Sequence, residues 1–217
     1  MAHRRGAAGV VLLIVGGALA SIALGWVLSR PGDPDVSAAA EPVVRDGALV
    51  DARTGDPWVP QGPSWSGFES ACAQGWGYSG LDPLGEDAEA EQAALIASWG
   101  ADTVRLPLNQ DCWLGTRGAP VSDDFVERTP EGYRRAVGRF VEALHEEGLV
   151  VVLDLHSRKR IGSAAFGSMA MPDSESLAFW RSVAAQYADS PSVLFDAFHA
   201  PHSRVDARGR SVLELDG

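Results

Sequence analysis

The run LVVVLDL, from Leu149 to Leu155, is continuously apolar apart from Asp154. A run of this length suits a strand of a parallel sheet, because helices cover both faces of such a strand. His156 follows directly. In parallel α/β folds the functional groups gather at the carboxyl ends of the strands. This stretch therefore predicts a fold class and the place of a site.

Helical patterns precede this run. Residues 133–147 are expected to form the clearest helix, because apolar residues recur there at helical spacing. Thr129 is the predicted N-cap of this helix, and Gly148 ends it. Residues 87–99 are expected to form an earlier helix. The apolar side chains expected on one side of the earlier helix are Leu95, Ile96 and Trp99.

Further strands complete the alternation. Strand-like runs span 103–108 and 193–198, and residues 58–65 are expected to supply a first strand. Strands that alternate with helices imply right-handed β-α-β units and a parallel sheet. A β-hairpin is expected in residues 43–59, where Asp46-Gly47 is a turn signal. The last helix is expected to be capped by Asp173 or Ser174, with Leu177, Trp180, Ala184 and Tyr187 facing inward.

The first thirty residues differ from the rest of the chain. A basic flank at residues 3–5 precedes an uncharged apolar run at residues 6–29. That run is long enough to cross a bilayer as a helix. We expect residues 1–29 to be a membrane anchor that spans at 7–28. The basic flank keeps the amino terminus in the cytoplasm, so the remainder lies outside the cell.

The remaining organisation is simple. Residues 30–42 are expected to be a linker of Pro, Asp, Ser and Ala, and residues 43–217 one domain. A cleaved signal peptide is the alternative to an anchor, and residues 38–40 offer a cleavage site for it. Both interpretations export the domain. The net charge of -11 argues against a nucleic-acid partner, since phosphates require a basic face.

The chain has two cysteines, Cys72 and Cys112. In an oxidising compartment an even pair suggests one disulfide, and two separate buried thiols are the alternative. A metal site is not expected here, because there is no CxxC and no histidine at ligand spacing from either cysteine. No cofactor is implied.

Polar side chains collect where the predicted strands end. Because the carboxyl ends of parallel strands meet at one edge of a sheet, these side chains are expected to form a site. Three of these residues also have a purely structural explanation: Arg105 would pair with Asp154, His156 would be a hydrogen-bonded core histidine, and Asn109 would cap a loop. In strand order, the residues are Glu69, then Arg105, Asn109, Gln110 and Asp111, then Asp154 and His156, then His199 and His202.

Five segments of the chain carry a family resemblance: SWSGFESACAQGWG, ADTVRLPLNQDCWLG, GLVVVLDLHS, Met171 to Asp173 with Phe179-Trp180, and VLFDAFHAPH. Taken in order, they resemble glycoside hydrolase family 5, the cellulase-like (β/α)8 barrels. The resemblance covers roughly residues 43–202. It implies a partial barrel of about four βα units and a polysaccharide or glycoside ligand, and it supports pairing of the two cysteines.

The resemblance also implies residue roles. In the family the counterparts of Arg105 and His156 line the subsite where the bond breaks. The predicted substrate-binding residues here are Glu69, Arg105, Asn109, His156, His199 and His202.

The sequence departs from the family after the fourth strand. The family has Asn-Glu-Pro there, and its Glu is the general acid/base, whereas this chain has His199-Ala200-Pro201. Retaining glycosidases need two carboxyl groups about 5–5.5 Å apart, and alanine can neither donate nor accept a proton. Loss of general acid/base catalysis costs roughly 10²–10⁴-fold in rate. No intact catalytic residue is therefore expected.

The second half of a barrel is not recognisable in the sequence. A complete barrel takes about 250 residues. The family's nucleophilic Glu on strand seven and the His-x-Tyr on strand six have no counterpart here. Four parallel strands leave both sheet edges open. A homodimer covering those edges is one expectation, and a truncated gene product is another.

Three functions follow from these observations. The first is a membrane-anchored relative of the hydrolases with little or no hydrolysis. The second is an active hydrolase of extracellular polysaccharide or glycolipid, whose carboxylates come from another chain or segment. The third is a non-catalytic module that binds carbohydrate or protein. Its aromatic residues Trp65, Trp76 and Trp113 would stack on sugars or fill the core.

Overall fold

The computed structural model describes residues 38–74, 88–120, 129–159, 166–167, 171–202, 204–205, 208 and 211–212. The predicted anchor, most of the linker and Trp76 lie outside these residues. Among the described residues, no helix combines the length and apolar character needed to cross a membrane.

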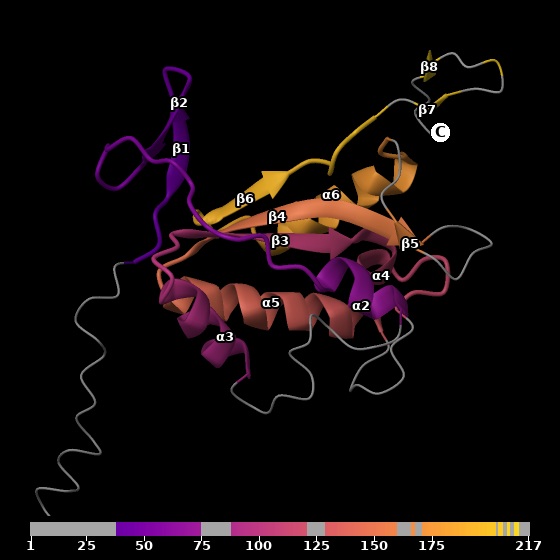
Figure 1. Cartoon of the computed structure of the whole chain (residues 1–217), viewed down its shortest axis with the longest axis horizontal. Coiled ribbons are helices and arrows are strands. Elements are labelled where there is room, and N and C mark those ends of the chain that lie inside the picture. The colour runs from indigo at the N-terminus through magenta and orange to yellow at the C-terminus, as the bar shows by residue number, and fades with distance from the viewer. Residues whose placement is uncertain are drawn as a thin grey trace, which may run out of the picture. The chain divides into compact units, whose positions relative to one another are not determined.

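A parallel sheet forms the centre of the fold (Figure 1). Strand β4 (Val150–Lys159) lies between β3 (Thr103–Asn109) and β6 (Val193–Asp196), and both neighbours run parallel to it. The short β5 (Phe166–Gly167) pairs antiparallel with the end of β4. The apolar run Leu149–Leu155 is thus confirmed as a parallel strand, which begins at Val150 and lies between two others. The fourth predicted strand is shorter than expected, because β6 ends at Asp196.

The predicted first strand is present only as an irregular extended segment. The backbone N–H of Arg105 donates to the carbonyl of Pro63 at 3.0 Å, and the N–H of Trp65 donates to the carbonyl of Arg105 at 2.8 Å. Ser64 forms a parallel bridge with Arg105. Prolines at 60 and 63 lack an amide hydrogen, which prevents a regular ladder. The order across the sheet is therefore residues 61–65, β3, β4 and β6.

Helix α5 (Pro130–Glu146) confirms the strongest helix prediction. The Thr129 hydroxyl accepts a hydrogen bond from the N–H of Gly132 at 3.0 Å, and Gly148 has φ +76° just beyond the helix. These features satisfy orphan groups at the two ends of a helix. The side chains that α5 buries include Tyr133, Val137, Phe140 and Leu144.

Helix α3 (Ala88–Ala97) packs against α5. Ile96 is fully buried, whereas Leu95 and Trp99, predicted on the same side, are exposed. The prediction of a shared apolar side is therefore wrong for these two residues. Ala88 and Ala93 are buried with Ile96 instead, and their small side chains let α3 approach its neighbours closely.

Helix α6 (Ser174–Gln186) begins at Asp173, which forms a capping box with Ser176. Its buried side agrees with the predicted one only in part: Tyr187 is buried as predicted, and Trp180 packs against the core. The core-facing residues are Ser176, Phe179 and Val183, followed by Tyr187, whereas Leu177 and Ala184 are exposed and Trp180 is half-buried. The helix lies beside the outermost strand β6, so only a narrow side of it meets the core.

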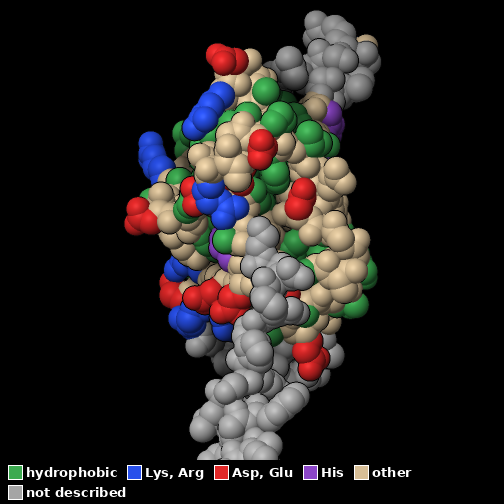
Figure 2. Space-filling model, turned by 90° about the vertical axis from the view of Figure 1, so that its left-hand side faces the viewer, with side chains coloured by type: hydrophobic (Ala, Val, Ile, Leu, Met, Phe, Trp, Pro, Cys, Tyr) green, Lys and Arg blue, Asp and Glu red, His purple; other side chains and the backbone are tan. Residues whose placement is uncertain are grey.

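The predicted hairpin is confirmed by β1 (Pro42–Arg45) and β2 (Ala48–Asp51), which pair antiparallel around Asp46-Gly47. Ser192, just before β6, donates a hydrogen bond to the carbonyl of Ala40 at 2.8 Å. The start of the hairpin therefore lies at the amino ends of the strands. Figure 2 looks at the molecule from that side and shows acidic and basic side chains interspersed with apolar ones. A second small antiparallel pair consists of β7 (Arg204–Val205) and β8 (Ser211–Val212).

Cys72 and Cys112 form a disulfide, as expected, with their Cα atoms 6.3 Å apart. It joins α2 (Phe68–Gln74) to α4 (Gln110–Leu114). Trp113 of α4 is fully buried, and its indole N–H donates to the hydroxyl of Ser182 at 3.0 Å. Of the two alternatives for Trp113, the structure therefore supports core filler.

Candidate functional site

Alternation along β4 separates core residues from site residues. Val151, Leu153 and Leu155 belong to the buried hydrophobic core. Asp154 and His156 lie on the opposite side of the strand, because successive side chains of a strand point to opposite faces. Arg105 of β3, Asp196 of β6 and His199 join them there. These five residues are called the Arg105 cluster below.

Arg105 is the centre of this cluster. One of its guanidinium nitrogens, Nη2, lies 2.7 Å from Oδ2 of Asp154, 2.9 Å from Nδ1 of His199 and 3.3 Å from Oδ2 of Asp196. The side chain of Asp154 is fully buried, and that of Arg105 is 26% exposed. The pairing of Arg105 with Asp154 is the structural alternative that the sequence suggested. A guanidinium in this place orients groups from three different segments.

The hydrogen bonds fix the tautomer of each neutral imidazole. His156 Nδ1 lies 2.7 Å from Oδ2 of Asp154, and an ionised carboxylate only accepts, so Nδ1 carries the proton. Nε2 of His156 is then an acceptor. The guanidinium of Arg105 only donates, so Nδ1 of His199 accepts and its proton lies on Nε2.

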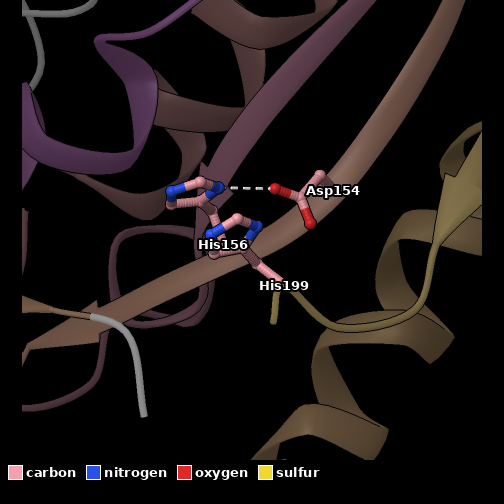
Figure 3. Close-up of side chains that lie close together, drawn as sticks. All are labelled: Asp154, His156 and His199. Atoms are coloured by element: carbon pink, nitrogen blue, oxygen red, sulfur yellow. Dashed lines mark hydrogen bonds and ion pairs between the residues drawn. The ribbon is translucent and has the colours of Figure 1, made fainter. Parts of the chain in front are cut away.

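The two imidazole rings are stacked, with their centroids 3.8 Å apart and their planes at 17° (Figure 3). The pKa of His199 is lowered from its ordinary value, first by burial and then by the positive charges of His156 in its protonated form and of Arg105, with Asp154 and Asp196 opposing. The neutral form of His199 is therefore favoured. The stack offers one acceptor and one donor, a combination suited to hydroxyl groups.

Asp154, His156 and His199 are also residue types that bind metals. One potential ligand atom of each lies within 4.8 Å of the others. The guanidinium Nη2 of Arg105, however, already lies at hydrogen-bond distance from Asp154 Oδ2 and His199 Nδ1. A metal ion at those atoms would have to displace this cation. The cluster therefore suits a guanidinium better than a metal ion.

Asn109 and Glu69 lie in a neighbouring network rather than in the cluster. The side-chain oxygen Oδ1 of Asn109 caps α4 by accepting hydrogen bonds from the backbone N–H groups of Asp111 and Cys112 at 2.9 and 3.2 Å. Its amide donates to the backbone carbonyl of Glu69 at 2.9 Å. Asn109 is completely buried, which supports the loop-cap alternative. The Glu69 carboxylate accepts from the N–H of Gly67 at 2.6 Å.

Gln110 and Asp111 serve packing at the start of α6. The Gln110 amide donates to Asp173 at 3.1 Å and accepts from the Ser176 hydroxyl at 2.7 Å. The carboxylate of Asp111 pairs with Arg117 at 2.6 Å. The buried Gln110 side chain therefore ties α4 to the helix that follows β4, and Asp111 is linked to that helix through Arg117, which also pairs with Glu175.

Ala200 and His202 are exposed on the segment after β6. Ala200 has φ +45°, in the left-handed region that side chains rarely adopt. His202 Nδ1 lies 3.0 Å from the carbonyl of Ala200, so it donates to that oxygen. The structure thus brings Arg105, His156 and His199 together and leaves His202 bonded to its own loop.

Sequence reasoning missed Asp196. Its carboxylate lies 3.3 Å from Arg105 and is 40% exposed. The available signal was the strand period, because Asp196 is the only charged residue in VLFD and lies two residues after Leu194. By the reasoning applied to Asp154, a charged residue near the end of a buried strand predicts a site residue.

The comparisons with known proteins agree with this arrangement. The family model described as Cellulase (glycosyl hydrolase family 5) matches residues 55–212. The chain belongs to glycoside hydrolase family 5.

Solved structures of endocellulases share the fold. One is an endocellulase from Pyrococcus horikoshii in complex with cellotetraose, with 20% identity, a TM-score of 0.54 and coverage of 80% of this chain and 46% of that chain. Another is the catalytic domain of the major endoglucanase from Xanthomonas campestris pv. campestris, with 22% identity, a TM-score of 0.52 and coverage of 76% and 46%. The chain therefore spans less than half the length of these family 5 structures.

Proposed function

We propose that this family 5 chain is a membrane-anchored, extracellular protein that binds a glycan at the Arg105 cluster and hydrolyses it little or not at all. The observation that carries the proposal is Ala200, which stands where the family's acid/base glutamate is expected. A methyl group cannot transfer a proton to a leaving group. The Arg105 cluster, by contrast, keeps the arginine and histidine that the family uses around the scissile bond.

The chemistry of the cluster favours a neutral polyhydroxylated ligand. His156 offers an acceptor and His199 a donor, so vicinal hydroxyls of one sugar can satisfy both. The charge of Arg105 is matched by the carboxylates of Asp154 and Asp196. An anionic ligand would therefore have to compete with two resident carboxylates. Cellotetraose is the first ligand to test, because a Pyrococcus horikoshii endocellulase has been solved with it.

Two features support an extracellular setting. The disulfide between Cys72 and Cys112 suits an oxidising compartment. The apolar run at residues 7–28, with its basic flank, suits an anchor that leaves the domain outside.

The test combines binding with turnover on the same protein. Cellotetraose should shift the imidazole NMR signals of His156 and His199, with a Kd in the micromolar to millimolar range, and reducing ends should not accumulate. His156→Ala should weaken binding at least about tenfold, because it removes the acceptor. His202→Ala is the control and should leave the Kd unchanged, because the His202 ring bonds to Ala200 rather than to the cluster. A comparable loss of affinity in this variant would instead support the predicted contact of His202 with the ligand. Release of reducing sugar by the unmodified chain would overturn the proposal.

The alternative is a non-catalytic module that binds protein rather than carbohydrate. Absence of binding to cellotetraose and to a wider panel of neutral glycans would favour it. The active-hydrolase hypothesis predicts a different result, namely turnover in which the product retains the β configuration. These outcomes separate the three functions.

A further inference from the structure

The two stacked imidazoles of the Arg105 cluster bond to groups of opposite charge. His156 donates from Nδ1 to the carboxylate of Asp154 at 2.7 Å, whereas Nδ1 of His199 accepts from the guanidinium of Arg105 at 2.9 Å. Hydrogen bonds that form a chain polarise one another. The carboxylate therefore makes Nε2 of His156 a stronger acceptor, and the guanidinium makes the Nε2–H of His199 a stronger donor.

The free nitrogens of the two rings face the same way. In Figure 3 the nitrogen of His156 that is not bonded to Asp154 points away from that carboxylate, and Nε2 of His199 lies on the same side of the stack. The side chain of His156 is 23% exposed, and His199 is half-buried. Within the described part of the chain, one edge of the stack therefore presents an acceptor and a donor side by side.

The spacing of the rings fits the attack of water on a carbonyl group. The centroids lie 3.8 Å apart and the planes meet at 17°, so two oxygens bonded to the same edge of each ring are separated by a similar distance. A carbonyl carbon lies about 1.2 Å from its oxygen. With the carbonyl oxygen on His199, a water on His156 is then about 3–3.5 Å from the carbon, which is the separation of a near-attack geometry.

We propose that the Arg105 cluster hydrolyses esters, and that its substrates are acyl groups carried by the hydroxyls of a neutral glycan. His156 is the general base that activates water, and His199 binds the carbonyl oxygen. The choice of a glycan ester rests on the proposed function, but the bond that breaks is not the glycosidic one. The reaction uses no carboxyl group at Ala200, so the loss of the family's glutamate does not prevent it.

The reaction balances with water as the only co-reactant. Nε2 of His156 takes a proton from water while the water oxygen bonds to the carbonyl carbon, and the N–H of His199 stabilises the oxyanion that forms. Collapse of this tetrahedral intermediate breaks the bond from the carbonyl carbon to the ester oxygen, and His156 returns the proton to the departing sugar oxygen. The products are a carboxylic acid and a free hydroxyl. Asp154 is a positioning residue, because it holds the tautomer of His156.

The test is ester hydrolysis by the purified full-length chain, first with p-nitrophenyl acetate and then with acetylated cellotetraose, from which acetate release is measured. The kcat/KM for p-nitrophenyl acetate should exceed the rate constant of free imidazole at least about a hundredfold, because the water and the carbonyl are held in place. Phenylalanine keeps a stacked ring but removes both nitrogens. His156→Phe should therefore lower kcat/KM about a hundredfold, and His199→Phe at least about tenfold.

His145→Gln is the matched histidine control. His145 lies in the last turn of α5, and its ring bonds to the backbone of Ser192, which precedes β6 at the amino ends of the strands. The substitution should leave ester hydrolysis unchanged, because the Arg105 cluster lies toward the carboxyl ends. Circular dichroism of each variant separates loss of activity from loss of fold, and the comparison with imidazole tests the inference without any variant.

The outcomes separate this inference from the proposed function. Hydrolysis no faster than by free imidazole, or equal rates in all variants, would overturn the inference. Acylated His156 that accumulates in mass spectra would also overturn it, because the ring would then attack the ester itself. Binding of cellotetraose without ester hydrolysis would overturn the inference and leave the proposed function standing. Hydrolysis of p-nitrophenyl acetate without binding of cellotetraose would support the ester reaction and overturn the proposed glycan site.

Discussion

Arg105 is the residue on which the site depends, because among the described residues it is the only arginine or lysine that pairs with the buried carboxylate of Asp154. His156 bonds to the same carboxylate oxygen through Nδ1 at 2.7 Å. The other oxygen of Asp154, Oδ1, is buried and has no hydrogen-bond partner among the described residues. Removing one member of such a pair leaves a buried charge uncompensated.

We therefore predict that Arg105→Met lowers the free energy of unfolding by about 3 kcal/mol or more, measured by urea denaturation. Arg139→Met is the matched control. Arg139 is 58% exposed and pairs with Glu89 at the surface, so its loss should cost less than about 1 kcal/mol. Equal effects of the two substitutions would contradict the importance of the Asp154 pair.

The pKa of His199 gives a second prediction. Its lowered pKa means that the unfolded chain takes up the proton first as the pH falls below about 6.5. The free energy of unfolding should therefore decrease over that range, and His199→Asn should reduce this decrease. His199 should titrate below 6.5 by NMR, and His156→Gln should move its pKa toward the ordinary value. An ordinary pKa for His199 in the unmodified chain would contradict the stacked arrangement of His156 and His199.

How much of the site the sequence could predict depended on each residue's position. Arg105, Asp154 and His156 lie within or directly after recognisable strands, so the rule that functional groups follow parallel strands located them. His199 was located by the same rule, as a polar residue after the fourth predicted strand. Asn109 was ambiguous, because a cap and a ligand contact have the same sequence appearance, and only its complete burial decides between them. The stacking of His156 on His199 follows from how β4 and the segment after β6 come together, which the sequence does not show.

At the scale of elements, helices with strong end signals were predicted well. Thr129 and Gly148 bound α5, and Asp173 begins α6, as expected. The buried sides of α3 and α6 were predicted only in part. Ile96 and Tyr187 are buried as expected, whereas other apolar residues of these segments are exposed, because exposed and core apolar residues look alike in sequence. Helical period shows which residues share a side, but it does not show whether a neighbouring element covers that side.

The disulfide provides a prediction at this scale. It joins α2 to α4 and closes a loop with a sequence separation of 40 residues. In the chain-entropy model, loss of such a link destabilises the fold by about 3–4 kcal/mol. We expect the double variant Cys72→Ser, Cys112→Ser to lose that amount in urea denaturation. A change below about 1 kcal/mol would mean that helix packing alone holds α2 and α4 together.

At the scale of the whole molecule, the alternation of strands and helices was sufficient to predict a parallel sheet, and the family resemblance to predict part of a barrel. The regularity of the first strand was not predictable from apolar content alone. Its prolines decide that, by removing amide donors from an otherwise strand-like segment. The sequence also does not show what covers the edges of the sheet, because an order of strands does not identify a partner for the outer ones.

The last prediction concerns the membrane. If residues 7–28 anchor the chain, it should stay in the membrane fraction after alkaline carbonate extraction and keep its full mass, and protease added outside the cell should digest the domain. Substituting two residues that flank the middle of the run, Val15→Arg and Leu19→Arg, should release the chain or block export, because each arginine costs about 2.5–3.5 kcal/mol at the centre of a bilayer. Mature protein that begins near residue 41 would instead establish a cleaved signal peptide, in which case the domain is secreted.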